Sequence, residues 1–348
     1  MSLYGLVLIK SASRAGGQFF LTHAVCIIFG ISVSLVIQFI DYRKLSKLWI
    51  LISMFCTLII ILTLIFGSSV QGASGVDAKA WIKVPGDFTF QPSELAKIGF
   101  LFSFAKHLEI LKEKGKINDF KSLLLFALHV MIPVFLIHLQ KDDGTALIFI
   151  FIAIFEMFIA GVDAKFFLIS LAIFALLIPV IWNFMLLPYQ KNRILSSLDP
   201  NADPYGIGFQ RIQSKISIGS GGFLGNGIFQ GRRVADGVVP IQESDFIMSV
   251  AGEELGFVGC FLMITFLLAL IFRISYISRI SRDYLGLYSC FGFLGMILSQ
   301  TIFNIGMCLS FFPVIGVTLP FFSAGGSSII CLFLGIGLIQ SIYMVRDD

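Results

Sequence analysis

Long apolar runs, separated by short polar segments, occupy almost the whole chain. Nine runs are long enough to cross the hydrocarbon core of a bilayer, which is about 30 Å thick and takes about 20 helical residues. Apolar and polar residues rarely alternate within them, which favours helices in lipid over a membrane barrel. We therefore expect an all-α polytopic membrane protein, with spans at residues 19–40, 47–67, 93–111, 121–139, 144–161, 165–187, 246–272, 284–310 and 325–345.

A tenth apolar run, from Leu3 to Ile9, is too short to cross a bilayer and ends at Ser11-Ala12-Ser13. It could be the remnant of a signal peptide, but no Ala-x-Ala cleavage site with suitable flanks follows it. We interpret it as a first span that is truncated at its start, for example by a misplaced initiation codon. The expected fold then has about ten transmembrane helices in one integral membrane domain, residues 1–348.

The composition supports this class of protein. Hydrophobic residues make up 57% of the 348 residues and charged residues only 13%, with a mean hydropathy of +0.93. A soluble domain of this size would need a more highly charged surface. The net charge of +4 is spread over the loops, which argues against nucleic acid as a partner. All six cysteines fall inside apolar runs, where we expect them to act as small hydrophobic residues.

The lysines and arginines of the short loops predict the orientation in the membrane. One set of alternate loops carries eleven of them and the opposite set carries four, so the first set is assigned to the cytoplasm. The outer loops then cover residues 68–92, 140–143, 188–245 and 311–324. The large extracytoplasmic loop, 188–245, is long enough to be translocated regardless of its charge. The eleven are Arg43, Lys44, Lys47, Lys106, Lys112, Lys114, Lys116, Lys121, Arg273, Arg279 and Arg282, and the four are Arg14, Lys79, Lys83 and Lys141.

With this topology, the unusual polar residues fall on the outer side. Asp245 ends the large loop directly before an apolar span. Carboxylates at the edge of a bilayer are costly and usually have a function, so Asp245 is a candidate functional residue.

Two further pairs of polar residues begin outer-side spans. Glu94 and Lys97 are three positions apart, so they share one face of a helix and can pair. Both a structural ion pair and a functional one remain open. Asp142 and Asp143 could bind a hard cation such as Mg²⁺ or Mn²⁺, with Asp142 as the candidate ligand, or could cap a helix.

Two glycine-containing segments complete the outer side. Residues 219–227 are rich in glycine, which lets backbone N–H groups approach a phosphate, although such stretches are often flexible loops. The flanking apolar residues indicate a segment that dips into the membrane interface. Residues 313–328 contain two prolines and a Gly-Gly-Ser-Ser sequence, which exclude one continuous helix. Non-helical backbone at this depth lies inside the protein or lines a polar cavity.

These motifs together resemble the SEDS family (shape, elongation, division and sporulation), and within it the RodA branch more than the FtsW branch. The matching blocks lie in the family's order along nearly the whole chain. The block that begins at Asn304 and the Gln213 to Ile216 block favour RodA. The blocks are residues 75–97, 140–146, 189–231, 240–259 and 304–328.

The resemblance implies a peptidoglycan glycosyltransferase that polymerises lipid II at the outer face of the bacterial cytoplasmic membrane, for cell elongation and rod shape. It also implies a class B penicillin-binding protein, a transpeptidase, as partner. The family's catalytic aspartate corresponds to Asp245, which would act as the general base of a single inverting displacement. Mg²⁺ or Mn²⁺ is the expected cofactor. The candidate substrate-binding residues are Glu94, Lys97, Arg193, Gln213, Ser214, Lys215 and Ser327, and Arg193, Arg211 and Lys215 are candidates for stabilising the leaving diphosphate.

The sequence departs from the family's motifs at two places. The usual Leu-Pro-Glu-x-His-Thr-Asp is here Val239 to Asp245, with Ile241 and Glu243 in place of Glu and His. The usual Pro-Asp-Leu is Lys141-Asp142-Asp143. A retaining mechanism with Glu243 and Asp245 is disfavoured, because residues two apart share a face only in an extended segment.

Two other functions remain as alternatives. A flippase for a lipid-linked precursor would place its polar residues along a pathway that reaches both sides of the membrane. A non-enzymatic scaffold for a transpeptidase would tolerate the loss of Asp245. The polar residues cluster on the outer side, which favours the enzyme.

Overall fold

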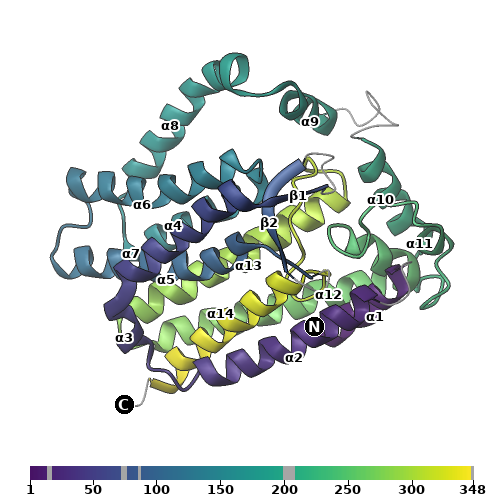
Figure 1. Ribbon diagram of the computed structural model, residues 1–348, viewed down its shortest axis with the longest axis horizontal. Helices are drawn as coiled ribbons and strands as arrows, with labels where there is room; N and C mark the ends of the chain where they lie inside the picture. The colour runs from purple at the N-terminus through teal and green to yellow at the C-terminus, as the bar shows by residue number, and fades with distance from the viewer. Residues whose placement is uncertain (14–17, 72–76, 85–87, 199–207, 346–348) are drawn as a thin grey trace.

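A computed structural model describes residues 1–13, 18–71, 77–84, 88–198 and 208–345 of the chain. Helices form at all nine predicted spans, so this prediction is confirmed (Figure 1). Eight of them are long and apolar enough to cross a membrane, within the described residues. The ninth, α5, carries several charged residues but has a largely buried surface. The nine are α2 (Gln18–Ile37), α4 (Trp49–Phe66), α5 (Pro92–Glu113), α6 (Phe120–Leu139), α7 (Asp143–Ala160), α8 (Ala164–Val180), α12 (Ile247–Ile280), α13 (Tyr284–Cys308) and α14 (Gly326–Met344).

The core of the bundle lies where α5, α7, α13 and α14 pack together. Phe104, Phe149 and Phe293 are fully buried there, among aliphatic side chains of the same helices. The outer helices instead turn large apolar side chains outward, as Phe55 of α4 and Phe135 of α6 do, at 53% and 56% exposed. A helix that is apolar all round suits a lipid environment. The bundle therefore has an interior packed by side chains and an apolar perimeter that faces lipid.

Shorter elements connect the spans. The apolar run at the start of the chain forms α1, which packs against α2 and α12. α12 runs eight residues beyond its predicted end and is kinked at Gly256, whose φ of 62° is left-handed. The connecting elements are α1 (Ser2–Ala12), α3 (Tyr42–Leu45), η1 (Ser46–Leu48), η2 (Ile181–Met185), α9 (Pro188–Leu198), α10 (Phe209–Ser220) and α11 (Arg232–Asp236).

A small antiparallel sheet, not anticipated from the sequence, follows α4. Its order is β1 (Ser68–Gln71), β2 (Asp77–Val84), β3 (Phe88–Phe90), and Ile82 pairs with Phe90. The backbone N–H of Lys79 donates to the carbonyl of Gln140 over 3.1 Å, which fixes the sheet beside the start of α7. The all-α class thus holds for the membrane-spanning part of the protein, and the sheet belongs to one of its loops.

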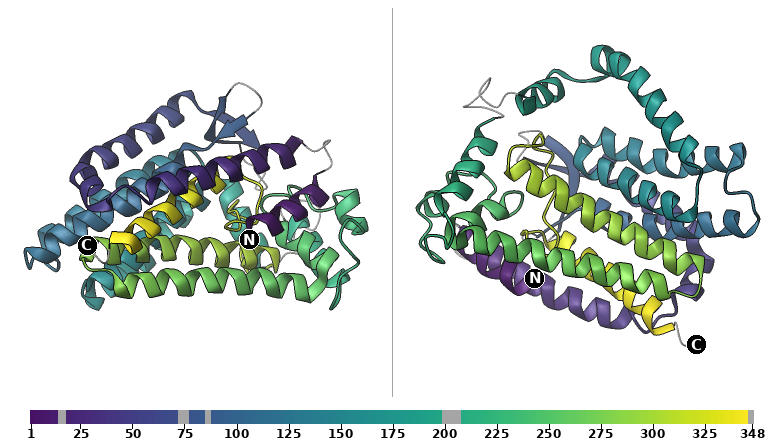
Figure 2. Two further views of the ribbon diagram at one scale, coloured as in Figure 1. Left: turned by 90° about the horizontal axis from the view of Figure 1, so that it is seen from below. Right: turned by 180° about the vertical axis from the view of Figure 1, so that it is seen from behind.

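The loops assigned to the outer side gather at one end of the bundle. The sheet, α10, α11 and the segment before α14 lie there, and α3 and the C-terminus lie at the other end (Figure 1). α8 has no buried residue and stands apart from the rest, and the chain returns through α9 towards the outer end (Figure 2). Arg14, one of the residues used to assign the orientation, lies outside the described residues.

Candidate active site

Asp245 lies at the end of the bundle where the loops assigned to the outer side gather, two residues before α12 begins, and its side chain is buried. Its backbone is held by Asn304 of α13, whose Nδ2 donates to the carbonyl of Asp245 over 2.9 Å and to that of Val317 over 2.8 Å. One amide of a core helix therefore fixes both the candidate catalytic residue and the non-helical segment that passes beside it.

Residues 319–323 of that non-helical segment, which spans residues 311–325, are buried, whereas Phe311 and Gly316 are exposed. The backbone N–H of Ala324 donates to the carbonyl of Glu243 over 2.8 Å, and the Ser323 hydroxyl donates to that of Ser244 over 2.6 Å. Gly316 has a left-handed φ of 69°, and a Cβ at this position would stand 3.7 Å from Oδ2 of Asp245. The carboxylate is therefore lined on one side by bare backbone, where a side chain would otherwise project.

The surroundings of Asp245 favour its protonated form. Burial is the largest cause and raises the pKa of Asp245 to about 6, and the charges of Glu243 and Asp142 act in the same direction. The Ser244 hydroxyl, which donates to Oδ1 over 3.0 Å, opposes the shift. A carboxylate with a pKa near the operating pH can accept a proton from a substrate hydroxyl and later release it.

Asp142 caps α7 and belongs to the same cluster as Asp245. Its carboxylate accepts hydrogen bonds from the backbone N–H of Thr145, over 3.2 Å, and from Nε2 of Gln91, over 2.8 Å. Burial raises the pKa of Asp142, and the hydrogen bonds from Thr145 and the ammonium of Lys97 oppose that rise. The interpretation of Asp142 as a helix cap is confirmed, and its place beside a second acid is compatible with a ligand role.

Glu94 and Lys97 form the predicted ion pair. Nζ of Lys97 lies 2.8 Å from Oε1 of Glu94, and the two side chains are only 2% and 8% exposed. Both groups are close enough to Asp142 to affect its charge, and Cys331 of α14 lies near them. A buried pair of this kind is costly to desolvate, so it is weak evidence for stability.

Four helices begin around this cluster, namely α5, α7, α12 and α14. Each helix N-terminus presents unsatisfied backbone N–H groups and the positive end of the helix dipole. Ser93 of α5 and Ser327 of α14 are also buried there, and their hydroxyl oxygens have no hydrogen-bond partner among the described residues. The arrangement suits an anion, and in particular a phosphate group.

Residues 208–245, the second part of the large loop, rest on the C-terminal end of α13. The Ser214 hydroxyl of α10 donates to the carbonyl of Cys308 over 3.0 Å, and Arg211, which is fully buried, donates to that of Ser310 over 2.6 Å. The side chain of Gln213 accepts a hydrogen bond from Arg233. Lys215 points to solvent, and the side chain of Arg193 lies outside the described part of the chain. Arg211 and Ser214 thus dock α10 onto the end of α13, and Gln213 joins α10 to α11. Cys308, whose carbonyl accepts from Ser214, also places its Sγ 3.7 Å from the carbonyl oxygen of Asp245.

The glycine-rich block packs tightly against α12. The backbone N–H groups of Asn226 and Gly227 donate to the carbonyls of Glu253 and Glu254, over 3.0 and 2.9 Å. A Cβ at Gly225 would stand 2.2 Å from the carbonyl oxygen of Glu254. These N–H groups are therefore used inside the protein, and the glycines serve close packing at the kink of α12. Phe223 is 68% exposed, which agrees with a segment that dips into the membrane interface.

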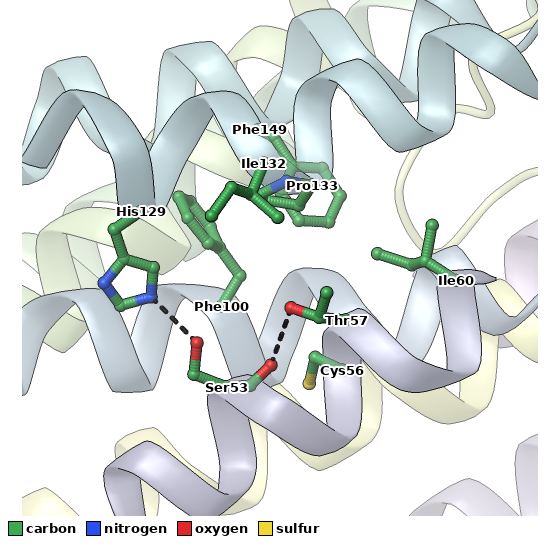
Figure 3. A pocket seen from close by; sticks show the side chains of 9 residues that line it. All are labelled: Ser53, Cys56, Thr57, Ile60, Phe100, His129, Ile132, Pro133 and Phe149. Atoms are coloured by element: carbon green, nitrogen blue, oxygen red, sulfur yellow. Dashed lines mark hydrogen bonds between the residues drawn. The ribbon is translucent and has the colours of Figure 1, made fainter.

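A separate cavity lies between α4, α5, α6 and α7, away from Asp245. It has a volume of about 120 Å³, and His129 points into it, with Nε2 at 3.2 Å from Oγ of Ser53 (Figure 3). Its walls are otherwise mostly apolar. None of the candidate site residues lines it, so it does not form part of the site described above.

The structure thus brings together Asp245, Asp142, Glu94 and Lys97, four of the residues selected from the sequence. Sequence reasoning assigned no site role to Ser244, Asn304 or Gly316. Asn304 served only as part of a motif, although an amide in the middle of an apolar run was a usable signal, because such a group needs a hydrogen-bond partner when buried. Gly316 gave no comparable signal, since its role depends on which side chain approaches it.

A polytopic helical membrane protein with a buried acidic cluster at one membrane face is the class defined by this fold and site. The family model described as "Cell cycle protein", which comprises FtsW, RodA and SpoVE, matches residues 1–347. The peptidoglycan glycosyltransferase MrdB of Escherichia coli strain K12 is 33% identical over 290 residues, covering 83% of this chain and 77% of that protein. The probable peptidoglycan glycosyltransferase FtsW of Geobacter metallireducens is 32% identical over 356 residues, covering 98% and 91%.

Solved structures agree with these relatives. A chain from a structure described as "Structural coordination of polymerization and crosslinking by a peptidoglycan synthase complex" has a TM-score of 0.83 and 30% identity, covering 99% of this chain and 95% of that one. The rod shape determining protein RodA of Thermus thermophilus has a TM-score of 0.73 and 27% identity, covering 100% and 94%. The chain belongs to the FtsW, RodA and SpoVE family, as the motifs indicated.

Proposed function

We propose that this protein is a peptidoglycan glycosyltransferase that polymerises lipid II into β-1,4-linked glycan strands at the outer face of the cytoplasmic membrane, for cell elongation. The observation that carries the proposal is Asp245, a buried carboxylate with a raised pKa at a point where four helices begin. The names of the relatives support the reaction class. The outer location rests on the distribution of Lys and Arg over the loops.

The geometry supports a single inverting displacement. Asp245 accepts the proton of the acceptor's 4-hydroxyl as that oxygen attacks the anomeric carbon of the donor sugar, and the lipid diphosphate leaves from the opposite side. A positioned general base contributes roughly 10²–10⁴-fold in rate. The N-termini of α5 and α14, with the hydroxyls of Ser93 and Ser327, are available to the leaving diphosphate.

A divalent cation fits this site only in part. Among the described residues, no group of three His, Cys, Asp or Glu side chains lies close enough to hold a metal ion. Mg²⁺ is commonly bound by one or two carboxylates together with substrate phosphates, and Asp142 beside Asp245 provides such carboxylates. We propose that Asp142 holds a divalent cation when substrate is bound, where the cation would supply positive charge to the leaving diphosphate.

The proposed partner is a class B penicillin-binding protein. The structural similarity to a chain of a peptidoglycan synthase complex supports this, because that complex couples polymerization to crosslinking. The apolar perimeter of the bundle provides lipid-facing surface on which a partner's membrane helix could pack.

The test is lipid II polymerisation by the purified full chain with its cognate transpeptidase, comparing wild type, Asp245→Ala and Glu243→Gln. We expect glycan strands from wild type and Glu243→Gln and none from Asp245→Ala, and we expect both active proteins to lose activity when a chelator removes divalent cations. Strands from Asp245→Ala would contradict the proposed base. Activity that survives chelation would contradict the cation alone, and loss of activity in Glu243→Gln would favour a mechanism with two carboxylates.

A further inference from the structure

A second polar cluster lies next to the acidic site and joins three separate elements. Nδ1 of His138, at the end of α6, lies 2.6 Å from Oδ1 of Asp143, the first residue of α7. The other carboxylate oxygen, Oδ2, accepts a hydrogen bond from Nε2 of Gln190 in α9 over 2.9 Å. Gln190 is only 8% exposed, and its own Oε1 accepts from the backbone N–H of Leu187 over 3.0 Å. Asp143 is therefore held between two partners, one on each side.

This polar cluster is connected to the acidic site through Asp142 and through the large loop. Asp143 is the direct neighbour of Asp142, which lies within electrostatic reach of Asp245. Gln190 stands at the start of the large outer segment that ends at Asp245. The cluster thus connects the beginning of that segment to the helix that carries Asp142.

Among the described residues, the helix that precedes the cluster packs on the bundle near its start. No residue of α8 is fully buried, and Phe166 and Phe167, in its first turn, pack against the hydrophobic core. At its inner end, Nδ2 of Asn118 donates to Oδ1 of Asp163 over 3.1 Å, and the backbone N–H of Asp163 donates back to Asn118 over 3.0 Å. At its outer end, the Gln190 to Asp143 hydrogen bond is the corresponding tie. Of these two ties, only the one at Gln190 links α9 directly to α7.

We propose that Asp143, oriented by His138, is a positioning residue that holds α9 at the entrance through which a lipid-linked substrate reaches Asp142 and Asp245. The substrate's lipid lies in the membrane while its diphosphate and sugars lie at the outer surface, so it must pass the helices that border the site. Asp143 acts through Gln190 and does not touch the reacting atoms. Its loss therefore raises KM and leaves kcat nearly unchanged. This inference rests on the proposed function for its substrate but not for its geometry.

The experiment measures position and kinetics on the full chain in lipid nanodiscs. Spin labels at Leu195→Cys of α9 and Phe135→Cys of α6, both exposed positions, report the distance between the two helices by pulsed electron paramagnetic resonance. The six natural cysteines are buried, which keeps background labelling low. Asp143→Ala and Gln190→Ala are compared with Asp143→Asn, which keeps an oxygen for Gln190, and with Asn118→Ala, which breaks the tie at the opposite end of α8.

We expect the distance distribution to broaden in Asp143→Ala and Gln190→Ala. In Asp143→Asn it should match that of the parent protein. With the transpeptidase partner present, KM for lipid II should rise about five- to tenfold in the two alanine variants, which is the upper range for one lost hydrogen bond. The double variant should be no worse than either single one, because both remove the same contact. Asn118→Ala should leave this distance and KM close to the parent values.

Two results would overturn the proposal. The first is an unchanged distance distribution in both alanine variants, and the second is a changed distribution with an unchanged KM. If the parent protein forms no glycan at all, the proposed function fails, and the distance measurement alone then decides whether Asp143 positions α9.

Discussion

At the scale of single residues, the chemistry of the site depends on how Asp245 is enclosed. Asn304 and the segment around Gly316 place its carboxylate in a buried position, and burial raises its pKa to about 6. A carboxylate in water, with a pKa of 3.8, would be a weaker base for a sugar hydroxyl. The enclosure therefore sets the basicity of the residue, and Ser244 limits how far it rises.

This gives a prediction for the pH dependence of the reaction. The base must be ionised to act, so kcat/KM should fall as the pH drops through about 6 and should be constant above it. Ser244→Ala removes the hydrogen bond that stabilises the ionised form, so the acid limb should move to higher pH. Polymerisation rates of both proteins between pH 4.5 and 8.5 check this. An acid limb that stays in place in Ser244→Ala would show that the hydroxyl does not act on Asp245.

At the scale of elements, the glycine-rich block and α12 form one packing unit. Gly221 and Gly225 lie so close to the backbone of α12 that any side chain would collide with it. At the kink of α12, a Cβ at Gly256 would in turn stand 2.4 Å from the backbone nitrogen of Gly225. From the sequence, we considered a phosphate-binding loop and a flexible loop here, and the flanking apolar residues indicated a segment that dips into the membrane interface. None of these interpretations anticipated the close packing, because glycine density alone does not show whether the approaching group is a ligand or another backbone.

The chain offers a matched pair of substitutions to test this packing. A Cβ at Gly221 would stand 1.9 Å from the carbonyl oxygen of Gly252, whereas a Cβ at Gly219 would meet nothing within 4 Å. We expect Gly221→Ala to destabilise the protein by about 1–3 kcal/mol through overpacking, and Gly219→Ala to have little effect. Thermal unfolding of the two variants in the same detergent checks this. Equal stabilities would mean that the block does not pack on α12 as described.

At the scale of the whole molecule, the membrane part could be predicted from the sequence and the outer part only in places. Long apolar runs specify spans because lipid requires every backbone group to be bonded within a helix. Asp245, Asp142 and the Glu94 to Lys97 pair could be selected because charged groups at a membrane face are rare. The sheet between Ser68 and Phe90 was missed, since short strands give little periodic signal. The tie between Asp143 and Gln190 was missed because the two residues are 47 positions apart.

The whole arrangement also requires one orientation in the membrane, since the proposed substrate is used at the outer face. Ser220, at the end of α10, and Lys116, at the opposite end of the bundle, are both exposed and can each be replaced by a single cysteine. The natural cysteines are buried, so the new thiols dominate labelling. We expect a membrane-impermeant maleimide added to intact spheroplasts to label Ser220→Cys and to label Lys116→Cys only after lysis. The reverse pattern would place the acidic cluster in the cytoplasm, away from any lipid II exposed at the outer face, and both the orientation and the proposed reaction would then fail together.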